Sequence, residues 1–369
     1  MRRGESRRHA HHLGHRTGPV NGSDVSGAGL GQKMPNIPLT VWLGGVQAPV
    51  IYQGRSGCCI GEDQIVFTVP NNVPTGCAVP LAVQINSLIS NYTSMPVANG
   101  SRGCTPSNPA LSQVNIEQDV TAGPVSYGAI TLSRNSTGPN AADTDDATFM
   151  FIKILEYGAG SQPFYASYLD NPPAGTCTVY NTLSPSTKPP IATSAAADAG
   201  PSFTVTGPNG NQTVQASGSG KFTAVLSAAG TFLSPGTYTV IGKGGADIGA
   251  FSATATMPAA PTLNTPALGT RSAGTTVTWS GGAPNAFVEI QVASPTDNTG
   301  TNGATAVCYG SSSAGTMAIP AYVMLALPAT NFGSFQFQQG TLAAFTASGL
   351  DIGQIQTNNA PTIVQFVSQ

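Results

Sequence analysis

Short runs of β-branched and aromatic residues, separated by Gly and Pro, are the feature that most constrains this chain. The 369 residues include 44 Gly and 29 Pro, so regular elements must be short. In residues 63–70 (DQIVFTVP), Ile65, Phe67 and Val69 fall on one face of an extended chain, which is the period of a half-buried strand. Many short strands joined by tight turns predict an all-β fold of tandem immunoglobulin-like sandwich modules.

The composition supports a folded chain of several modules. Only 8% of the residues are charged, against about 25% in an ordinary soluble domain. Disordered chains combine low hydrophobicity with high net charge, whereas this chain is 40% hydrophobic with a net charge of −2. The length alone favours more than one domain.

The basic residues and histidines gather at the start of the chain. Residues 1–16 hold five arginines and all four histidines, and Glu5 is the only acid among them. Basic segments that bind nucleic acid neutralise phosphates, but no basic groove with interleaved aromatic residues follows here. We therefore expect a disordered basic arm over residues 1–36 and no nucleic-acid partner.

Neither a signal peptide nor a membrane span is apparent in the sequence. The basic start lacks the apolar stretch of about 7–15 residues that a signal peptide carries. The longest uncharged apolar stretch, residues 318–329, is interrupted by prolines and is shorter than the ~20 residues that a bilayer needs.

The first module is expected over residues 37–98, where the motifs are familiar. A strand ending in Gly44-Gly45 leads to an IYQG turn, a QIVFTVP strand, a PTG turn and a PLAVQI strand followed by SN. This series resembles the uncharacterised Solibacter-type C-terminal domain of secreted acidobacterial proteins. The resemblance implies an IPT/TIG-like, immunoglobulin-like sandwich and a secreted protein, and it suggests that the chain is truncated at its front. It extends more loosely into the later modules and implies no activity.

Three further modules are expected. Residues 99–195 form a β-rich segment that ends in a Pro/Ser-rich linker, and the apolar run 149–157 (FMFIKILEY) is either a buried strand or one short helix. Residues 196–258 form a small sandwich that starts with a hairpin turning at Pro208-Asn209-Gly210. Residues 259–369 form a C-terminal sandwich, with Trp279 as a core residue.

The six cysteines favour disulfides over zinc. None lies in a CxxC pair and no histidine is near them. Our preferred bridges are Cys59–Cys77 and Cys104–Cys177, each within one module, although spacing does not determine connectivity. Cys58 and Cys308 are then either free or paired with each other. Disulfides imply an oxidising compartment, so we expect a secreted or cell-surface protein.

No catalytic centre is predicted. Every histidine lies in the basic arm, which excludes a Ser-His-Asp triad and an HExxH zinc site elsewhere. Asp143, Asp145 and Asp146 are a weak calcium candidate, because Ca²⁺ prefers several oxygen ligands, but the EF-hand Gly and Glu are missing. No other cofactor is expected.

Aromatic residues are the other candidates for a binding role. Tyr165 and Tyr168 are weak candidates for stacking on a sugar ring, and further aromatic candidates are Trp42, Tyr52 and Tyr180. Strand tryptophans are more often core residues. We therefore expect a non-catalytic structural or adhesive module array with cell-wall, polysaccharide or protein partners. The alternative is a carbohydrate-binding accessory region of a larger secreted enzyme.

Overall fold

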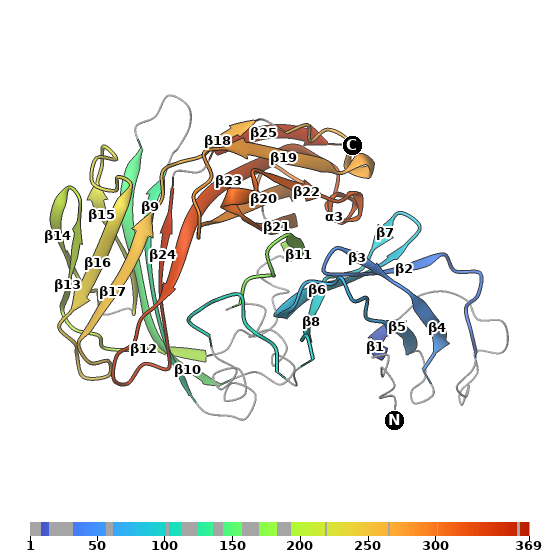
Figure 1. The fold of residues 1–369 in the computed structure, drawn as a ribbon, viewed down its shortest axis with the longest axis horizontal. Coiled ribbons are helices and arrows are strands. Elements are labelled where there is room, and N and C mark those ends of the chain that lie inside the picture. Colours follow the sequence, from blue (N-terminus) through green and yellow to red (C-terminus); the bar gives the residue numbers. More distant parts are fainter. Residues whose placement is uncertain are drawn as a thin grey trace.

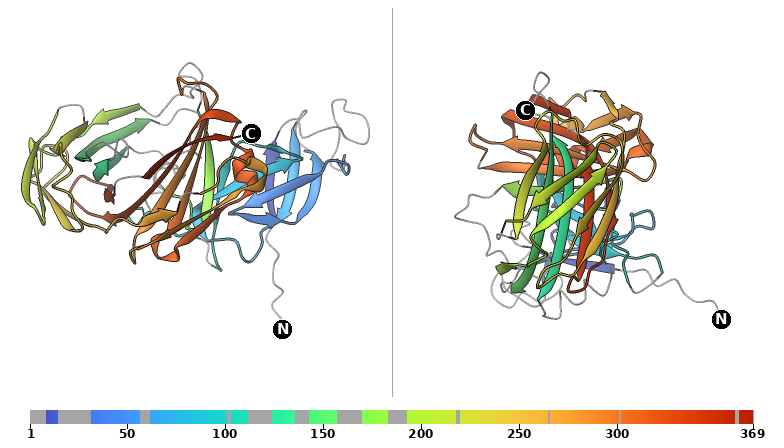
Figure 2. Two further views of the ribbon diagram at one scale, coloured as in Figure 1. Left: turned by 90° about the horizontal axis from the view of Figure 1, so that it is seen from above. Right: turned by 90° about the vertical axis from the view of Figure 1, so that its left-hand side faces the viewer.

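The computed structural model of the chain is almost entirely β-structure, arranged as three sandwiches (Figures 1 and 2). It describes residues 9–14, 32–56, 62–100, 103–111, 124–135, 143–156, 170–182, 193–217, 220–264, 266–300, 302–359 and 362–368. The all-β prediction is confirmed.

The N-terminal sandwich is built from neighbouring parts of the chain. One sheet has the order β1-β5-β4, and the other has the order β3-β2-β6-β7, with β8 also paired to β6. The strands are β1 (His9–Gly14), β2 (Leu39–Leu43), β3 (Val46–Ala48), β4 (Val50–Arg55), β5 (Asp63–Thr68), β6 (Gly76–Ile85), β7 (Leu88–Ile89) and β8 (Thr93–Val97). The alternation predicted for β5 is present, because Ile65 and Phe67 are buried between the sheets with Val41 and Leu43.

The turn between β2 and β3 shows why its glycines are needed. Gly44 and Gly45 have φ values of +54° and +85°, which favour glycine. A Cβ on Gly44 would lie 2.9 Å from the Val79 side chain, so this turn packs directly against β6.

A ten-stranded sheet runs through the rest of the molecule and is shared by two sandwiches. Its order is β11-β21-β20-β23-β24-β9-β10-β12, with β15 also paired to β10 and β25 to β23. The strands are β9 (Val125–Asn135), β10 (Thr144–Glu156), β11 (Thr176–Thr182), β12 (Thr193–Ala196), β15 (Lys221–Ser227), β20 (Phe287–Pro295), β21 (Gly303–Ser311), β23 (Thr330–Ala344), β24 (Ile352–Asn358) and β25 (Thr362–Ser368).

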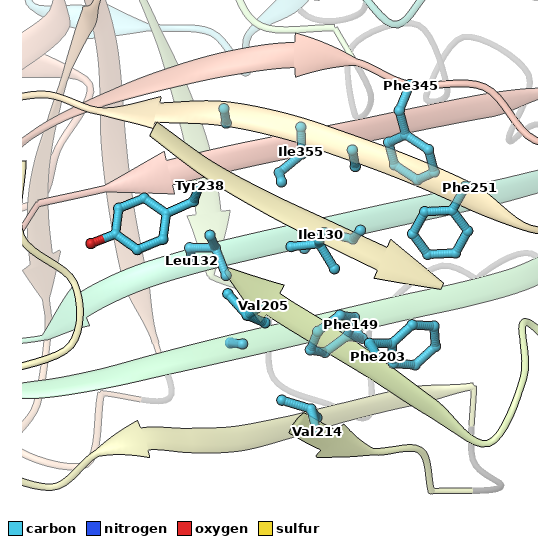
Figure 3. Packing of buried hydrophobic residues seen from close by; sticks show 14 of the residues in the cluster. Ile130, Leu132, Phe149, Phe203, Val205, Val214, Tyr238, Phe251, Phe345 and Ile355 are labelled. Atoms are coloured by element: carbon cyan, nitrogen blue, oxygen red, sulfur yellow. The ribbon is translucent and has the colours of Figure 1, made fainter. Parts of the chain in front are cut away.

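The middle sandwich consists of a four-stranded sheet packed on the β10-β9-β24 part of the shared sheet. The order is β14-β13-β16-β17, and the strands are β13 (Ser202–Gly207), β14 (Gly210–Gln215), β16 (Gly236–Gly242) and β17 (Phe251–Met257). Aromatic rings from both sheets meet in the core, where Phe149 stacks on Phe203 with ring centroids 4.7 Å apart (Figure 3). Ile355 of β24 is fully buried in the same cluster.

The C-terminal sandwich covers the other half of the shared sheet. Its small sheet has the order β18-β19-β22, formed by β18 (Thr262–Asn264), β19 (Thr275–Ser280) and β22 (Thr316–Ile319). The short helices η2 (Arg271–Ala273), η3 (Ser312–Ala314) and α3 (Ala321–Leu325) complete it. Trp279 is 4% exposed, and its indole Nε1 donates a hydrogen bond to the Ser312 carbonyl at 2.6 Å, which confirms its predicted core role.

One long hairpin joins the two sandwiches. β23 pairs with β24 through residues 340–344 and with β25 through residues 330–337, so β24 and β25 follow each other along a single edge of β23. β24 then pairs in parallel with β9, which lies more than 200 residues earlier in the chain. The C-terminal segment therefore completes a core whose other strands come from the middle of the sequence (Figure 1).

The N-terminal sandwich contacts the rest of the molecule through an aromatic pair. The rings of Trp42 and Tyr322 are parallel within 4° and their centroids are 4.4 Å apart. Ile89 and Tyr92 pack beside them against the core of the C-terminal sandwich. Burial raises the pKa of Tyr322 to about 12, and it also raises the pKa of Tyr92.

The module boundaries differ from the prediction beyond residue 98. Strands from the expected segments 99–195, 196–258 and 259–369 share one sheet, because β24, β9 and β15 pair across those boundaries. The run FMFIKILEY belongs to strand β10 rather than to a helix. Within the arm expected to be disordered, residues 9–14 form β1, which pairs antiparallel with β5.

Candidate functional sites

The three aspartates of the predicted calcium loop lie at the start of β10 and have separate roles. The Asp145 side chain is fully buried, and both carboxylate oxygens accept hydrogen bonds from Arg134, at 2.9 and 3.3 Å. The backbone N–H groups of Phe232 and Leu233 donate to its Oδ2 atom, both at 2.7 Å. Asp145 therefore fixes the 230–233 loop to β9 and β10, and its hydrogen bond raises the pKa of Arg134.

This geometry corrects the calcium prediction. Asp146 accepts a hydrogen bond from the Asn135 side-chain amide at 2.7 Å, whereas the side-chain partner of Asp145 is Arg134. Asp143, Asp145 and Asp146 do not converge, and no group of three His, Cys, Asp or Glu side chains within the described ranges is arranged to hold a metal ion. Successive side chains of an extended strand point to opposite faces, so Asp145 and Asp146 point apart. The prediction had placed them in a loop.

The disulfides also differ from the predicted pairs. Cys77 is bonded to Cys104, and Cys177 is bonded to Cys308. Cys58 and Cys59 lie outside the described residues. The predicted Cys59–Cys77 and Cys104–Cys177 bridges were wrong because we assumed that each bridge stays within one module. Cys177 and Cys308 face each other on the adjacent strands β11 and β21, across 131 residues of sequence.

The candidate aromatic residues are distributed over several environments. Trp42 is stacked on Tyr322, and Tyr52 donates its hydroxyl hydrogen bond to the Arg55 carbonyl at 2.7 Å. Tyr165 and Tyr168 lie outside the described residues. Tyr180 is 42% exposed on β11, so its ring is open to solvent.

Tyr180 belongs to a broader surface, which we call the outer face. It comprises the β11, β21, β20, β23 and β25 side chains that point away from the C-terminal core, and its members include Thr178, Tyr180, Phe287, Glu289, Gln291, Ala293, Thr305, Val307, Tyr309, Ser334, Gln336, Gln338, Ile363, Gln365 and Val367. Their sequence neighbours on these strands, such as Val288, Ile290 and Val292, are buried in that core. Glu289 and Gln291 therefore lie on the side of β20 opposite the core.

Glu289 lies on the outer face but is only 7% exposed. Its Oε1 atom accepts a hydrogen bond from the Gln291 amide, and its carboxylate accepts another from the Tyr309 hydroxyl. Burial and the nearby Glu289 raise the pKa of Tyr309, and Tyr180 adds to this effect electrostatically. The Phe287 ring centroid is 6.0 Å from that of Tyr309. The two rings therefore lie on the outer face close to Glu289, whose carboxylate already accepts hydrogen bonds from Gln291 and Tyr309.

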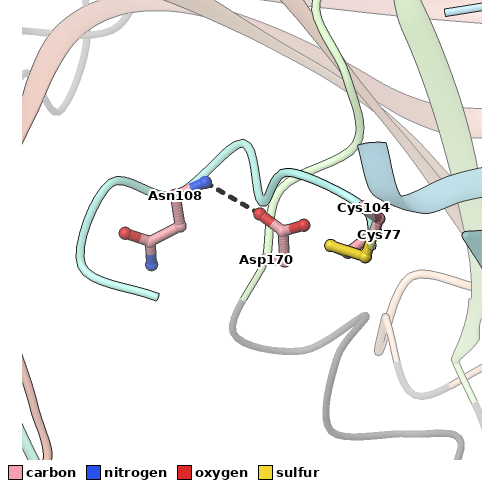
Figure 4. Close-up of a disulfide and its surroundings, with 4 residues drawn as sticks. All are labelled: Cys77, Cys104, Asn108 and Asp170. Carbon is pink, nitrogen blue, oxygen red and sulfur yellow. Dashed lines mark hydrogen bonds between the residues drawn. A yellow bond between two sulfur atoms is a disulfide. The ribbon is translucent and has the colours of Figure 1, made fainter. Parts of the chain in front are cut away.

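A second cluster, around Asp170, was not anticipated from the sequence (Figure 4). Asp170 is 1% exposed, and its Oδ1 atom accepts a hydrogen bond from the Asn108 backbone N–H at 2.8 Å. The Asn108 side-chain amide donates to Gln354 of β24 at 2.6 Å. Burial raises the pKa of the Asp170 carboxyl to about 6, although the backbone hydrogen bonds oppose this rise. The segment containing Asn108 is held at Cys104 by its disulfide to β6.

None of the helices in the described part of the chain has both the length and the apolar character that crossing a membrane requires.

Comparisons with known proteins identify no family for this chain. No family model matches the chain, and no curated protein is found to be similar to it. The crystal structure of dimeric latent PorU from Porphyromonas gingivalis is similar at 12% sequence identity, with a TM-score of 0.16. That likeness covers 90% of this chain, which spans 29% of the length of the PorU chain, and it carries no argument. The resemblance to the Solibacter-type domain stays a prediction.

Proposed function

We propose that the chain is a non-catalytic structural or adhesive unit of a secreted or cell-surface protein. The observation that carries this proposal is the shared ten-stranded sheet, which joins the middle and C-terminal sandwiches through strands from distant parts of the sequence. A continuous hydrogen-bonded sheet resists bending between modules far better than a linker does. Such a unit is suited to holding a binding surface at a fixed orientation.

The two disulfides within the described part of the chain support placing the protein outside the cytoplasm. Disulfides persist in oxidising compartments and are rare in the reducing cytosol. Cys77–Cys104 fastens the end of the N-terminal sandwich, and Cys177–Cys308 fastens the edge of the shared sheet. Both bridges reinforce the architecture, which is consistent with a structural role.

The test is to locate the protein in its native host and to map its thiols. We expect it in the surface or secreted fraction, with peptides carrying Cys77–Cys104 and Cys177–Cys308 bridges under non-reducing conditions. Native material found inside the cell with these four thiols free would contradict the proposal.

A second candidate function is carbohydrate binding as an accessory region of a larger secreted enzyme. The partly exposed Tyr180 ring, on the same face of the sheet as Tyr309, favours it. Tyrosine rings offer an apolar surface with a polar end, which suits ligands that are partly apolar and partly hydroxylated. Saturable binding to a polysaccharide, competed by the free sugar, would favour this candidate. Binding to the host cell-wall fraction without sugar competition would favour the structural unit.

A further inference from the structure

The outer face of the C-terminal sandwich is arranged in rows that run across the strands. In one row, Thr178, Val307, Gln291, Gln336 and Ile363 lie directly opposite one another on β11, β21, β20, β23 and β25. Neighbouring strands lie about 4.8 Å apart, so this row extends for about 19 Å. That is long enough for several sugar rings in an extended chain.

Two further rows flank the first. Tyr309, Glu289 and Gln338 are in register on one side, and Thr305, Ala293 and Ser334 are in register on the other. Tyr180 lies opposite Thr305 at the β11 end of the second flanking row. Tyrosines therefore lie on both sides of the central row, toward its β11 end.

Most side chains of these rows are uncharged hydrogen-bonding groups, whereas Val307, Ile363 and Ala293 are apolar. Gln291, Gln336 and Gln338 each carry an amide, which both donates and accepts hydrogen bonds, as sugar hydroxyl groups do. All three glutamines are partly exposed. The rows contain no Lys or Arg, and their one carboxylate, Glu289, is already engaged by Gln291 and Tyr309.

The exposed surface also argues against a protein partner. Protein interfaces have a buried apolar centre surrounded by polar residues. Here the centre of the face carries Gln291 and Gln336, and the exposed apolar side chains of the face, Ile363 and Val367, both lie on β25 at the end of the rows. An amide-rich centre between tyrosines fits a hydroxylated chain better.

We propose that the outer face binds an uncharged polysaccharide chain laid across the strands. The glutamine amides along the central row form hydrogen bonds with sugar hydroxyls, and the exposed ring of Tyr180 lies against a sugar face. Glu289 is a positioning residue, which orients Tyr309 and Gln291. This inference rests on the carbohydrate-binding candidate and assigns its site and ligand class.

The experiment is affinity electrophoresis of the full chain in gels that contain hydroxyethyl cellulose, xylan or galactomannan, with Tyr180→Ala and Gln336→Ala as test variants. We expect the unmodified protein to be retarded by at least one of these neutral polymers. Each variant should weaken the association by about fivefold or more, since each removes a ring contact or an amide hydrogen bond.

The matched controls lie on the four-stranded sheet of the middle sandwich. Gln212→Ala removes an exposed amide from β14, and Ile241→Ala removes an apolar side chain that is 46% exposed on β16. Both should bind as the unmodified protein does. Thermal melting checks each fold, and Gln336→Glu, which keeps the shape of the side chain, replaces Gln336→Ala should that variant melt early.

The outcomes distinguish failure of the proposed outer-face site from failure of the carbohydrate-binding candidate itself. Retardation of the unmodified protein with unchanged binding by both test variants would overturn the site and leave the carbohydrate-binding candidate standing. Absence of retardation in all three polymers would overturn both. Loss of binding in the test variants alone would support the inference.

Discussion

The N-terminal sandwich and the shared-sheet region solve the same packing problem with different chain topologies. In the N-terminal sandwich, β2 pairs with β3, and β6 pairs with β7 and β8, all within residues 39–97. In the shared sheet, β24 pairs with β9 and β11 pairs with β21, across much of the chain. The first region behaves as a module, whereas the second can form its cores only when distant segments have met. We expect the two regions to differ in cooperativity and in folding rate, since non-local pairing slows folding.

The two tryptophans make this comparison measurable. Trp42 reports on the N-terminal sandwich at its contact with Tyr322, and Trp279 is buried in the C-terminal core. Variants that keep one tryptophan and replace the other with Phe allow the two regions to be followed separately.

The largest expected effect comes from the disulfides. Replacing Cys177 and Cys308 with Ala opens a loop of 131 residues, for which chain entropy predicts a loss of about 5 kcal/mol. The matched pair Cys77 and Cys104 closes 27 residues, and its removal should cost about 3.5 kcal/mol. Urea unfolding monitored at Trp279 checks the first value. A smaller loss for the Cys177 pair than for the Cys77 pair would contradict the entropic account.

Core substitutions in the two regions should differ in how far from the substitution they destabilise the protein. Ile355 of β24 and Ile65 of β5 are 0% and 2% exposed, and truncating either to Ala should cost about 2–5 kcal/mol. Ile355→Ala should lower the unfolding midpoint seen at Trp279, although Ile355 lies in the core of the other sandwich, because β23 and β24 link both cores. Ile65→Ala should mainly lower the midpoint seen at Trp42. Equal shifts at both probes for both variants would show that the molecule unfolds as one unit.

The same contrast explains what could be predicted from the sequence. Period-two alternation located β5 because it depends only on residues within the strand. The parallel pairing of β24 with β9 leaves no local pattern, so the boundaries at residues 195 and 258 were drawn through a continuous sheet. The disulfide partners failed for this reason, since Cys177 and Cys308 belong to different expected modules.

The candidate site residues could likewise be predicted only where the residue type was informative without knowledge of its neighbours in space. Tyr180 was among the aromatic candidates because its residue type alone is informative. Tyr309 and Glu289 were not candidates, because their importance comes from lying opposite each other on β20 and β21. Asp170 carries no motif at all. Its character comes from burial, which only the folded arrangement of Asn108 and β24 provides.

Asp170 lies at the connection between the two regions and should make stability depend on pH. Its pKa in the folded protein is about 6, against an ordinary value of 3.8. Between these values the folded state binds more protons than the unfolded state, so stability falls as pH rises from about 4 to about 6. The full cost, present above pH 6, is about 3 kcal/mol.

The variant Asp170→Asn tests this effect because it keeps the oxygen that accepts the Asn108 hydrogen bond and cannot ionise. It should be more stable than the unmodified protein at pH 7.5, by up to about 3 kcal/mol, and the advantage should vanish below pH 4. Urea unfolding across this pH range provides the measurement. A stability difference that is constant with pH would mean that folding does not shift the pKa of Asp170.

The smallest expected effect concerns the contact between the two regions. Stacked aromatic pairs contribute about 1 kcal/mol beyond the area they bury. A double-mutant cycle with Trp42→Leu and Tyr322→Leu isolates this term, because the cost that Tyr322→Leu imposes on its own region cancels. The fluorescence probe of the N-terminal sandwich is lost with Trp42, so circular dichroism must follow unfolding. A coupling energy of about 1 kcal/mol would mean that the N-terminal sandwich is held in a defined orientation by a specific contact. A coupling energy near zero would mean that the Cys77–Cys104 tether and the Asn108–Asp170 hydrogen bond fix this sandwich without help from the aromatic pair.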